Sequence, residues 1–163
     1  MFRTGFAVLA LLAMFLSAAA NSALAQCNPE RLEEFLENRA FELSAREKIK
    51  LYSERLVQYY DKNDVSRRDV LELIEAWERR WPERIYKYIS IVEYRKTEAA
   101  DACKVQFAYR FLAYSPKRGK VSAGIGVSTL VLADVQGDGL FKIIGEVGSV
   151  KCRGLQKFAR SRC

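Results

Sequence analysis

The sequence predicts an α+β domain in which N-terminal helices pack on a curved, four-stranded antiparallel meander sheet. Two observations support this fold class. Apolar residues recur every three or four positions in the first half of the chain, which is typical of helices, and at every second position after Pro82, which is typical of strands. Polar and glycine-containing segments separate the alternating stretches, as expected between consecutive antiparallel strands.

Residues 1–25 have the pattern of a secretory signal peptide. Arg3 supplies the positive start, Phe6 to Leu16 form a short apolar stretch, and Ala23-Leu24-Ala25 matches the small-x-small cleavage pattern. We therefore expect cleavage near Ala25 and a periplasmic or secreted product. We expect no transmembrane span, because a span needs about 20 apolar residues.

Residues 26–163 are the expected mature protein, a single exported α+β domain with a basic C-terminal tail. These 138 residues (163 minus 25) suffice for one hydrophobic core. Removal of Arg3 with the signal peptide leaves 26 basic residues against 20 acidic ones, a formal charge of +6. The tail, Lys151 to Cys163, carries basic residues and no acid.

Three helices are expected before Pro82. The first has Asn28 as its N-cap and Pro29 in its first turn. A second covers Ala45–Tyr59, and a third begins at Ser66, whose spacing to Asp69 matches a capping box. The positions that share a face are, helix by helix, Leu32, Phe35, Leu36 and Arg39; Ala45, Ile49, Tyr52, Leu56 and Tyr59; and Val70, Ile74, Trp77 and Trp81.

Four long strands follow, over Ile85–Lys96, Cys103–Tyr114, Val121–Ala133 and Leu140–Lys151. In the second of them, the positions from Val105 to Phe111 with odd numbers form one face. Small residues at 122, 124, 126 and 128 share one face of the third strand, where they favour close packing of a helix over the floor of a pocket.

Four cysteines, at 27, 103, 152 and 163, indicate two disulfides in an exported chain. A meander separates Cys103 and Cys152 by about 30 Å, at roughly 3.3 Å per residue, whereas a disulfide needs Cα atoms within roughly 7 Å. Two pairings remain, Cys27–Cys103 with Cys152–Cys163, or Cys103–Cys163 with Cys27–Cys152. We favour the first.

Within residues 45–150, several motifs resemble a known family. They are Tyr59-Tyr60-Asp61-Lys62, Val65-Ser66-Arg67, Val70-Leu71, and Arg80-Trp81-Pro82-Glu83-Arg84 with Tyr86. In these motifs the chain is similar to a small bacterial domain, also attached to caspase-like peptidases, that belongs to the NTF2-like (SnoaL-like) superfamily. The resemblance implies a cone of helices closing a curved sheet. It also implies a binding role, since the catalytic dyad of such fusions lies in the peptidase portion.

The chain departs from NTF2-like enzymes in two respects. We find no short strand hairpin between its helices, and it contains no histidine, the commonest general base. We assign no catalytic residue. A cofactor-free site would use a carboxylate and tyrosines, and its candidates are Asp101, Tyr86 and Tyr109.

No cofactor or metal site is expected. Asp134, Gln136, Asp138 and Gly139 resemble the start of a calcium loop, but Gly145 stands where such a loop needs its closing glutamate. The segment is therefore interpreted as a hairpin connection.

The sequence favours an exported, disulfide-stabilised, non-catalytic binding or interaction domain of the cell envelope. The alternative is a cofactor-free isomerase or dehydratase that uses a carboxylate and tyrosines inside the cone. Expected partners are a small apolar ligand, an envelope polyanion or a protein, with a homodimer possible and nucleic acid not expected. The residues expected to bind are Arg79, Arg80, Arg84, Tyr86, Tyr88, Arg110 and Tyr114.

Overall fold

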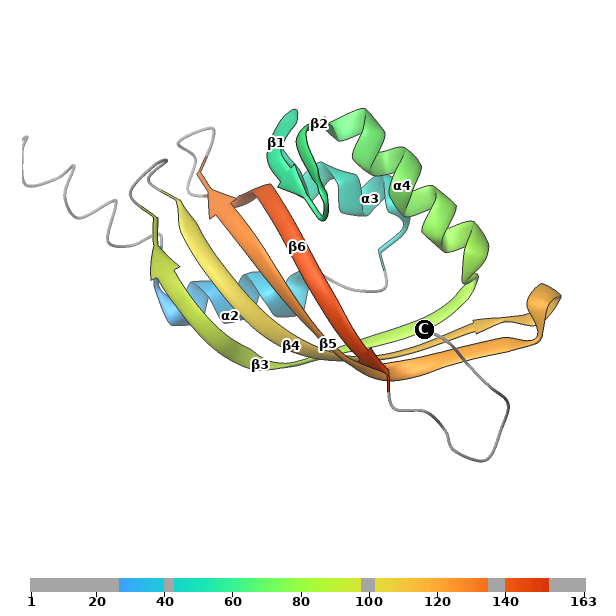
Figure 1. Cartoon of the computed structure of the whole chain (residues 1–163). Coiled ribbons are helices and arrows are strands. Elements are labelled where there is room, and N and C mark those ends of the chain that lie inside the picture. Colours follow the sequence, from blue (N-terminus) through green and yellow to red (C-terminus); the bar gives the residue numbers. More distant parts are fainter. Residues whose placement is uncertain (1–26, 40–42, 98–101, 135–139, 153–163) are drawn as a thin grey trace, which may run out of the picture.

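The expected change from helical to strand structure at Pro82 is confirmed in the computed structural model, which describes residues 27–39, 43–97, 102–134 and 140–152. The described chain forms an α+β fold with three α-helices and a six-stranded sheet (Figure 1). The predicted signal peptide and the tail from residue 153 onward lie outside the described residues. None of the helices in the described ranges is long and apolar enough to cross a membrane.

The first and third expected helices are confirmed. Helix α2 covers Pro29–Asn38, and the Asn28 side chain accepts a hydrogen bond from the Glu30 amide at 2.8 Å. Helix α4 covers Arg67–Arg80, and Ser66 caps it by accepting from the Asp69 amide at 3.2 Å. One position on its expected buried face is wrong, because Trp77 is 46% exposed.

The second expected helix, over Ala45–Tyr59, is wrong beyond its first turns. Helix α3 covers Ala45–Lys48 and a 3₁₀ turn, η1, covers Ile49–Leu51. The chain then forms a hairpin of β1, Arg55–Tyr59, and β2, Lys62–Ser66. The hairpin between the helices, which the sequence analysis did not find, is therefore present.

The four expected long strands are confirmed as β3 (Glu83–Lys96), β4 (Cys103–Ser115), β5 (Lys120–Ala133) and β6 (Lys142–Cys152). The 3₁₀ turn η2, Pro116–Arg118, joins β4 to β5. Strands β3 to β6 form the predicted antiparallel meander.

The sheet as a whole differs from the prediction of four antiparallel strands. The hairpin adds two strands, and β1 pairs parallel with β6, so the sheet is mixed, with the order β2-β1-β6-β5-β4-β3. Figure 1 shows the long strands bending, with α3, α4 and the β1–β2 hairpin gathered on the concave side. We call this concave side the inner face. It carries the alternate residues that include Phe107 and Tyr109 of β4.

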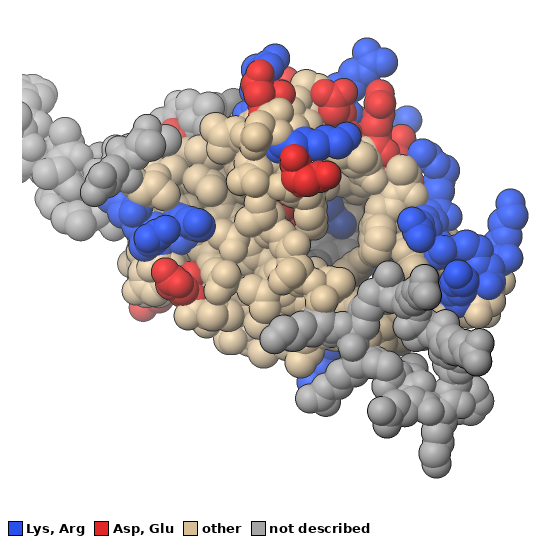
Figure 2. Space-filling view, viewed as in Figure 1, with Lys and Arg blue, Asp and Glu red and all other residues tan. Residues whose placement is uncertain are grey.

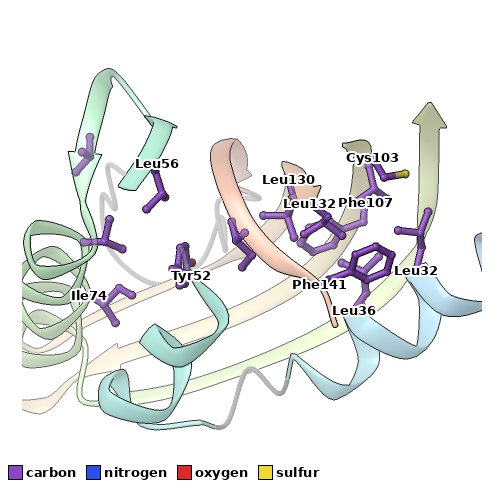
Figure 3. Packing of buried hydrophobic residues seen from close by; sticks show 14 of the residues in the cluster. Leu32, Leu36, Tyr52, Leu56, Ile74, Cys103, Phe107, Leu130, Leu132 and Phe141 are labelled. Carbon is purple, nitrogen blue, oxygen red and sulfur yellow. The ribbon is translucent and has the colours of Figure 1, made fainter. Parts of the chain in front are cut away.

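The hydrophobic core lies on the inner face. Figure 3 shows Leu32 and Leu36 of α2 beside Phe107 and Phe141, and all four are buried. The same figure shows Ile74 of α4 and Tyr52, which follows η1, in a second group. Side chains from both groups line the cavity described below.

The predicted disulfide between Cys27 and Cys103 is confirmed, with Cα atoms 5.4 Å apart. It joins Cys27, which precedes the N-cap residue of α2, to the first residue of β4. The predicted pairing of Cys152 with Cys163 lies outside what the structure describes.

Candidate functional site

A cavity of about 500 Å³ lies between α4, the β1–β2 hairpin and the inner face of the sheet. Figure 2 shows a hollow in the middle of this face of the molecule, with Lys or Arg atoms visible inside it. Rings from five elements or their ends form much of its wall: Tyr52, Tyr59, Tyr60, Trp77, Tyr86, Phe107 and Tyr109. The volume lies in the range of small-molecule sites.

At the inner end of this wall, three buried polar side chains form a closed network. Arg39 Nη2 donates to Glu146 Oε2 at 2.8 Å and to the Tyr52 hydroxyl at 3.1 Å. The Tyr52 hydroxyl in turn donates to the same oxygen of Glu146 at 2.5 Å. Arg39 and Glu146 are each 7% exposed, so the charges compensate one another away from water.

Each member of this network is positioned by a different element. Arg39 follows the last residue of α2, Tyr52 follows η1, and Glu146 lies on the inner face of β6, paired with Leu130. Burial opposes the charge of Arg39, but Glu146 and Tyr52 together raise the pKa of its guanidinium. Burial and then the charge of Glu146 raise the pKa of Tyr52 well above its usual range.

The other cavity phenols are shifted in the same direction. Burial and the Glu146 carboxylate raise the pKa of Tyr59, and the same two causes, with the carboxylate first, raise that of Tyr60. Burial raises the pKa of Tyr109 to about 12. These phenols are therefore neutral at physiological pH, when each keeps a hydroxyl proton that can be donated.

Tyr86 and Tyr109 meet in the wall formed by β3 and β4, with ring centroids 6.0 Å apart. Trp77 Nε1 donates to the Tyr86 hydroxyl at 3.0 Å, which brings α4 to this wall. A Cβ atom at Gly126 would overlap Cζ of Tyr109, so the Tyr109 ring occupies the space that a side chain at this position would need. The small residues of β5 were expected to pack against a helix, but Gly126 admits this ring and Ser128 lines the cavity.

Tyr60 has an uncommon backbone conformation, with φ at 55°. It occupies the turn between β1 and β2, and its ring lies 4.9 Å from that of Tyr59. A bulky residue at positive φ is strained, and such strain gathers at functional sites. Here it holds an aromatic side chain in the cavity wall.

Three of the residues predicted to act in a site line this cavity: Tyr86, Tyr109 and Arg84. Arg84 is paired, since Nη2 contacts Glu78 Oε1 at 3.0 Å and Nη1 donates to the Trp81 carbonyl at 2.7 Å. The sequence could not indicate that these side chains lie in one cavity. Arg84 and Tyr86 lie on β3, whereas Tyr109 lies on β4.

The remaining predicted residues lie elsewhere. Arg79 is exposed beside Glu75, and Arg80 is exposed at the end of α4. The hydroxyl of Tyr88 is 3.5 Å from Glu33, while Arg110 and Tyr114 lie on the outer face of β4. Asp101 falls outside the described residues.

Sequence reasoning missed Lys48 and Glu146 as cavity residues, and it placed Arg39, Tyr52 and Tyr59 on helical faces without a site role. A signal existed for two of them. Arg39 continues the apolar face of Leu32 and Leu36, and Glu146 interrupts an apolar strand. A charged residue on a buried face requires a partner, but the sequence does not identify that partner.

The described residues contain no group of three His, Cys, Asp or Glu side chains that could hold a metal ion. Asp134 is described, but positions 135–139 of the calcium-like segment lie outside the described chain.

No protein-family model matches the sequence, and no curated protein sequence matches it. Among solved structures, the chain is similar to a candidate scytalone dehydratase from Novosphingobium aromaticivorans, with a TM-score of 0.59 and 12% identity over 81% of this chain and 88% of that one. It is also similar to AclR, a candidate hydroxylase from Streptomyces galilaeus, with a TM-score of 0.54 and 19% identity over 75% of each chain.

A third similar structure is an uncharacterised protein with a cystatin-like fold from Caulobacter vibrioides. Its TM-score is 0.55, with 11% identity over 75% of this chain and 86% of that one. These neighbours share the NTF2-like, or cystatin-like, fold, which confirms the fold part of the resemblance seen in the sequence. At these identities the likeness concerns the fold alone.

Proposed function

We propose that this protein is an exported binding domain that holds a small, largely apolar ligand with aromatic character in its cavity. The observation that carries the proposal is the cavity wall itself, in which aromatic rings surround a space of about 500 Å³. Planar rings offer a ligand broad apolar contact, and neutral phenols offer it hydrogen bonds at a few fixed points.

The state of Glu146 favours binding over catalysis. A general base needs a lone pair that can reach the substrate proton. Oxygen Oε2 of Glu146 already accepts from both Arg39 and Tyr52, and the side chain is buried. We therefore interpret this carboxylate as a structural group that holds one end of the cavity.

A cofactor-free isomerase or dehydratase is the second candidate. It is favoured by the fact that Glu146 and the phenols of Tyr86 and Tyr109 line one cavity, as such chemistry needs an acid and hydroxyl donors together. Two structural neighbours carry names of enzymes, a candidate dehydratase and a candidate hydroxylase. Their identities of 12% and 19% do not extend the activity to this chain.

Export is part of the proposal. The signal-peptide pattern of residues 1–25 supports it, and the disulfide between Cys27 and Cys103 supports an oxidising compartment. The resemblance to a domain attached to caspase-like peptidases stays a prediction, as do the envelope polyanion and protein partners.

Ligand binding is tested with N-phenyl-1-naphthylamine, a neutral aromatic probe whose fluorescence rises in apolar sites. We expect saturable binding to the wild type. Gly148→Leu should weaken it about tenfold or more, because the added side chain enters the cavity. A Cβ at Gly148 meets only ordinary contacts, the nearest being the Val127 carbonyl at 3.4 Å, so the variant should fold.

The matched control is Ala123→Leu, which adds the same side chain on the outer face of β5. It should bind the probe as the wild type does. Equal binding by both variants, or no saturable binding by the wild type, would refute the proposed cavity function. Native mass spectrometry of protein from its own source would show a retained ligand directly.

A further inference from the structure

Lys48 differs from Arg39 and Arg84, the other buried or half-buried cations of the cavity wall, in having no ion pair among the described residues. It lies at the end of α3, its side chain is half-buried, and it lines the cavity wall. Within the described parts of the chain, its ammonium group has neither a hydrogen bond nor an ion pair. Such a group is costly in an apolar wall unless something compensates its charge.

The neighbouring cations are already compensated. Arg39 is held by Glu146 at 2.8 Å, and Arg84 is held by Glu78 at 3.0 Å. The three cations Arg39, Lys48 and Arg84 therefore face two carboxylates, which leaves a net charge of +1 at this part of the wall. Asp61 and Lys62 on the hairpin also line the cavity, but both are exposed, and their formal charges of opposite sign leave this net charge unchanged.

The surroundings of Lys48 also disfavour its charge. Burial first, and then the positive charges of Arg39 and Arg84, lower the pKa of the Lys48 ammonium, against the opposing effect of Glu78 and Glu146. A bound anion would stabilise the protonated form. The positive charge of the Lys48 ammonium group is therefore the one at this part of the wall that no carboxylate among the described residues pairs with directly.

We infer that the ligand is an aromatic or apolar monocarboxylate, whose carboxylate pairs with Lys48 and whose body lies against the aromatic wall. This inference rests on the proposed binding function and narrows it to one chemical class. A single negative charge matches the single excess positive charge, whereas a dianion would leave the wall with a new excess of negative charge. The rings of Trp77, Tyr86 and Tyr109 supply the apolar contact.

The test compares 2-naphthoate with 2-naphthamide, which share the ring system and differ in charge, by isothermal titration calorimetry. Lys48→Met removes the charge and leaves an unbranched side chain that is one atom shorter. It should weaken naphthoate binding by about tenfold to a hundredfold, the usual range for a charged hydrogen bond, and change naphthamide binding far less. Lys50→Met is the matched control, because Lys50 is exposed on η1 outside the cavity.

The outcomes separate the inference from the proposed function. If neither compound binds the wild type, the cavity function itself fails. If both bind and Lys48→Met leaves naphthoate affinity unchanged, or if only naphthamide binds, the inference is overturned and the cavity function stands. Lys48→Arg keeps the charge and should retain the preference for naphthoate.

If Lys48→Met does not fold, a pH titration of the wild type tests whether Lys48 pairs with the ligand carboxylate. Naphthoate affinity should fall as pH rises through the lowered pKa of Lys48, because the neutral amine no longer attracts the anion. Naphthamide affinity should not follow this curve. The charged groups that act on Lys48 are Arg39, Arg84, Glu78 and Glu146. Burial raises the pKa of the cavity phenols Tyr52 and Tyr109, which separates their titration from that of Lys48. Parallel curves for the two compounds would overturn the inference.

Discussion

At the residue scale, the buried ion pair of Arg39 and Glu146 lines the cavity, and removal of either residue should lower the stability of the fold. Arg39 Nη2 and Glu146 Oε2 are 2.8 Å apart, and the Tyr52 hydroxyl forms hydrogen bonds with both side chains. We expect Arg39→Met and Glu146→Leu each to lower the free energy of unfolding by about 3–5 kcal/mol, because each leaves the other charge buried alone. The double variant should cost less than the sum of the two, and urea unfolding of all three measures the coupling.

An exposed pair provides the comparison for this prediction. Arg55 and Asp64 contact at 2.5 Å, but their side chains are 65% and 75% exposed. Arg55→Met should therefore change the free energy of unfolding by less than about 1 kcal/mol. Additive effects of the two buried substitutions would show that Arg39 and Glu146 do not depend on each other.

Individual site residues could be predicted from sequence only when their type suggested a role. Tyr86, Tyr109 and Arg84 were candidates for this reason, and all three line the cavity. Glu146 was not a candidate, because an isolated glutamate on a strand resembles any surface acid. Its importance comes from Arg39, which is 107 positions away in sequence and reaches it only through the fold.

At the scale of elements, the periodicity of apolar residues predicted helices α2 and α4 and strands β3 to β6, but it did not predict the β1–β2 hairpin. Residues 45–59 carry apolar side chains at helical spacing, yet the chain leaves the helix after η1 and pairs β1 with β6. That pairing brings together residues such as Gln58 and Gly145, which are far apart in sequence. Tertiary pairing overrode local periodicity here, so the two extra strands could not be predicted from the local pattern.

The junction of α4 with β3 depends on Trp81. Its side chain is 7% exposed, and the Arg118 guanidinium lies 4.3 Å from its ring centroid. Arg118 also donates to the Arg80 carbonyl at 2.9 Å, so η2 is held against the end of α4. Trp81→Ala should lower the free energy of unfolding by about 3–5 kcal/mol, measured by urea denaturation.

Trp77→Ala is the matched control for this substitution on the same helix. Trp77 is 46% exposed, so its removal should cost clearly less stability than removal of Trp81. It should nevertheless weaken binding of the neutral probe, because Trp77 lines the cavity and donates to Tyr86. An unchanged urea midpoint for Trp81→Ala would contradict the dependence of the α4–β3 junction on this tryptophan.

At the scale of the whole molecule, the positive charge predicted for the surface is partly neutralised within the chain. Near α4, Arg67 contacts Glu54, Arg68 contacts Glu72 at 3.4 Å, and Arg79 contacts Glu75 at 3.8 Å. A polyanion partner stays a prediction, and residues 153–163 of the basic tail lie outside the described residues.

The outer face of the sheet has a different character. Ile85, Leu112 and Ile125 lie on neighbouring strands β3, β4 and β5, and they are 66%, 44% and 36% exposed. Exposed apolar side chains on one face are typical of surfaces that meet a partner. A homodimer through this face stays a prediction.

Helix α2 connects stability to the cavity, because it is anchored at both ends. The disulfide to Cys103 holds its start across 76 positions of sequence, and the Arg39–Glu146 pair holds its end. Cys27→Ala with Cys103→Ala should lower the free energy of unfolding by about 2–4 kcal/mol, the usual effect of removing such a link. The paired substitution avoids a free thiol at Cys103, which is fully buried.

Probe binding should survive this loss of stability. Leu32 and Leu36 remain buried against the sheet, and Arg39 still reaches Glu146, so the cavity end of α2 keeps its place when the other end is released. Urea unfolding and N-phenyl-1-naphthylamine titration of the same variant measure the two effects separately. Loss of probe binding in a folded variant would mean that the disulfide, rather than the buried ion pair, positions α2 at the cavity. Retained binding would assign that role to Arg39, and the disulfide would then serve the stability of the fold, as expected for the proposed exported protein.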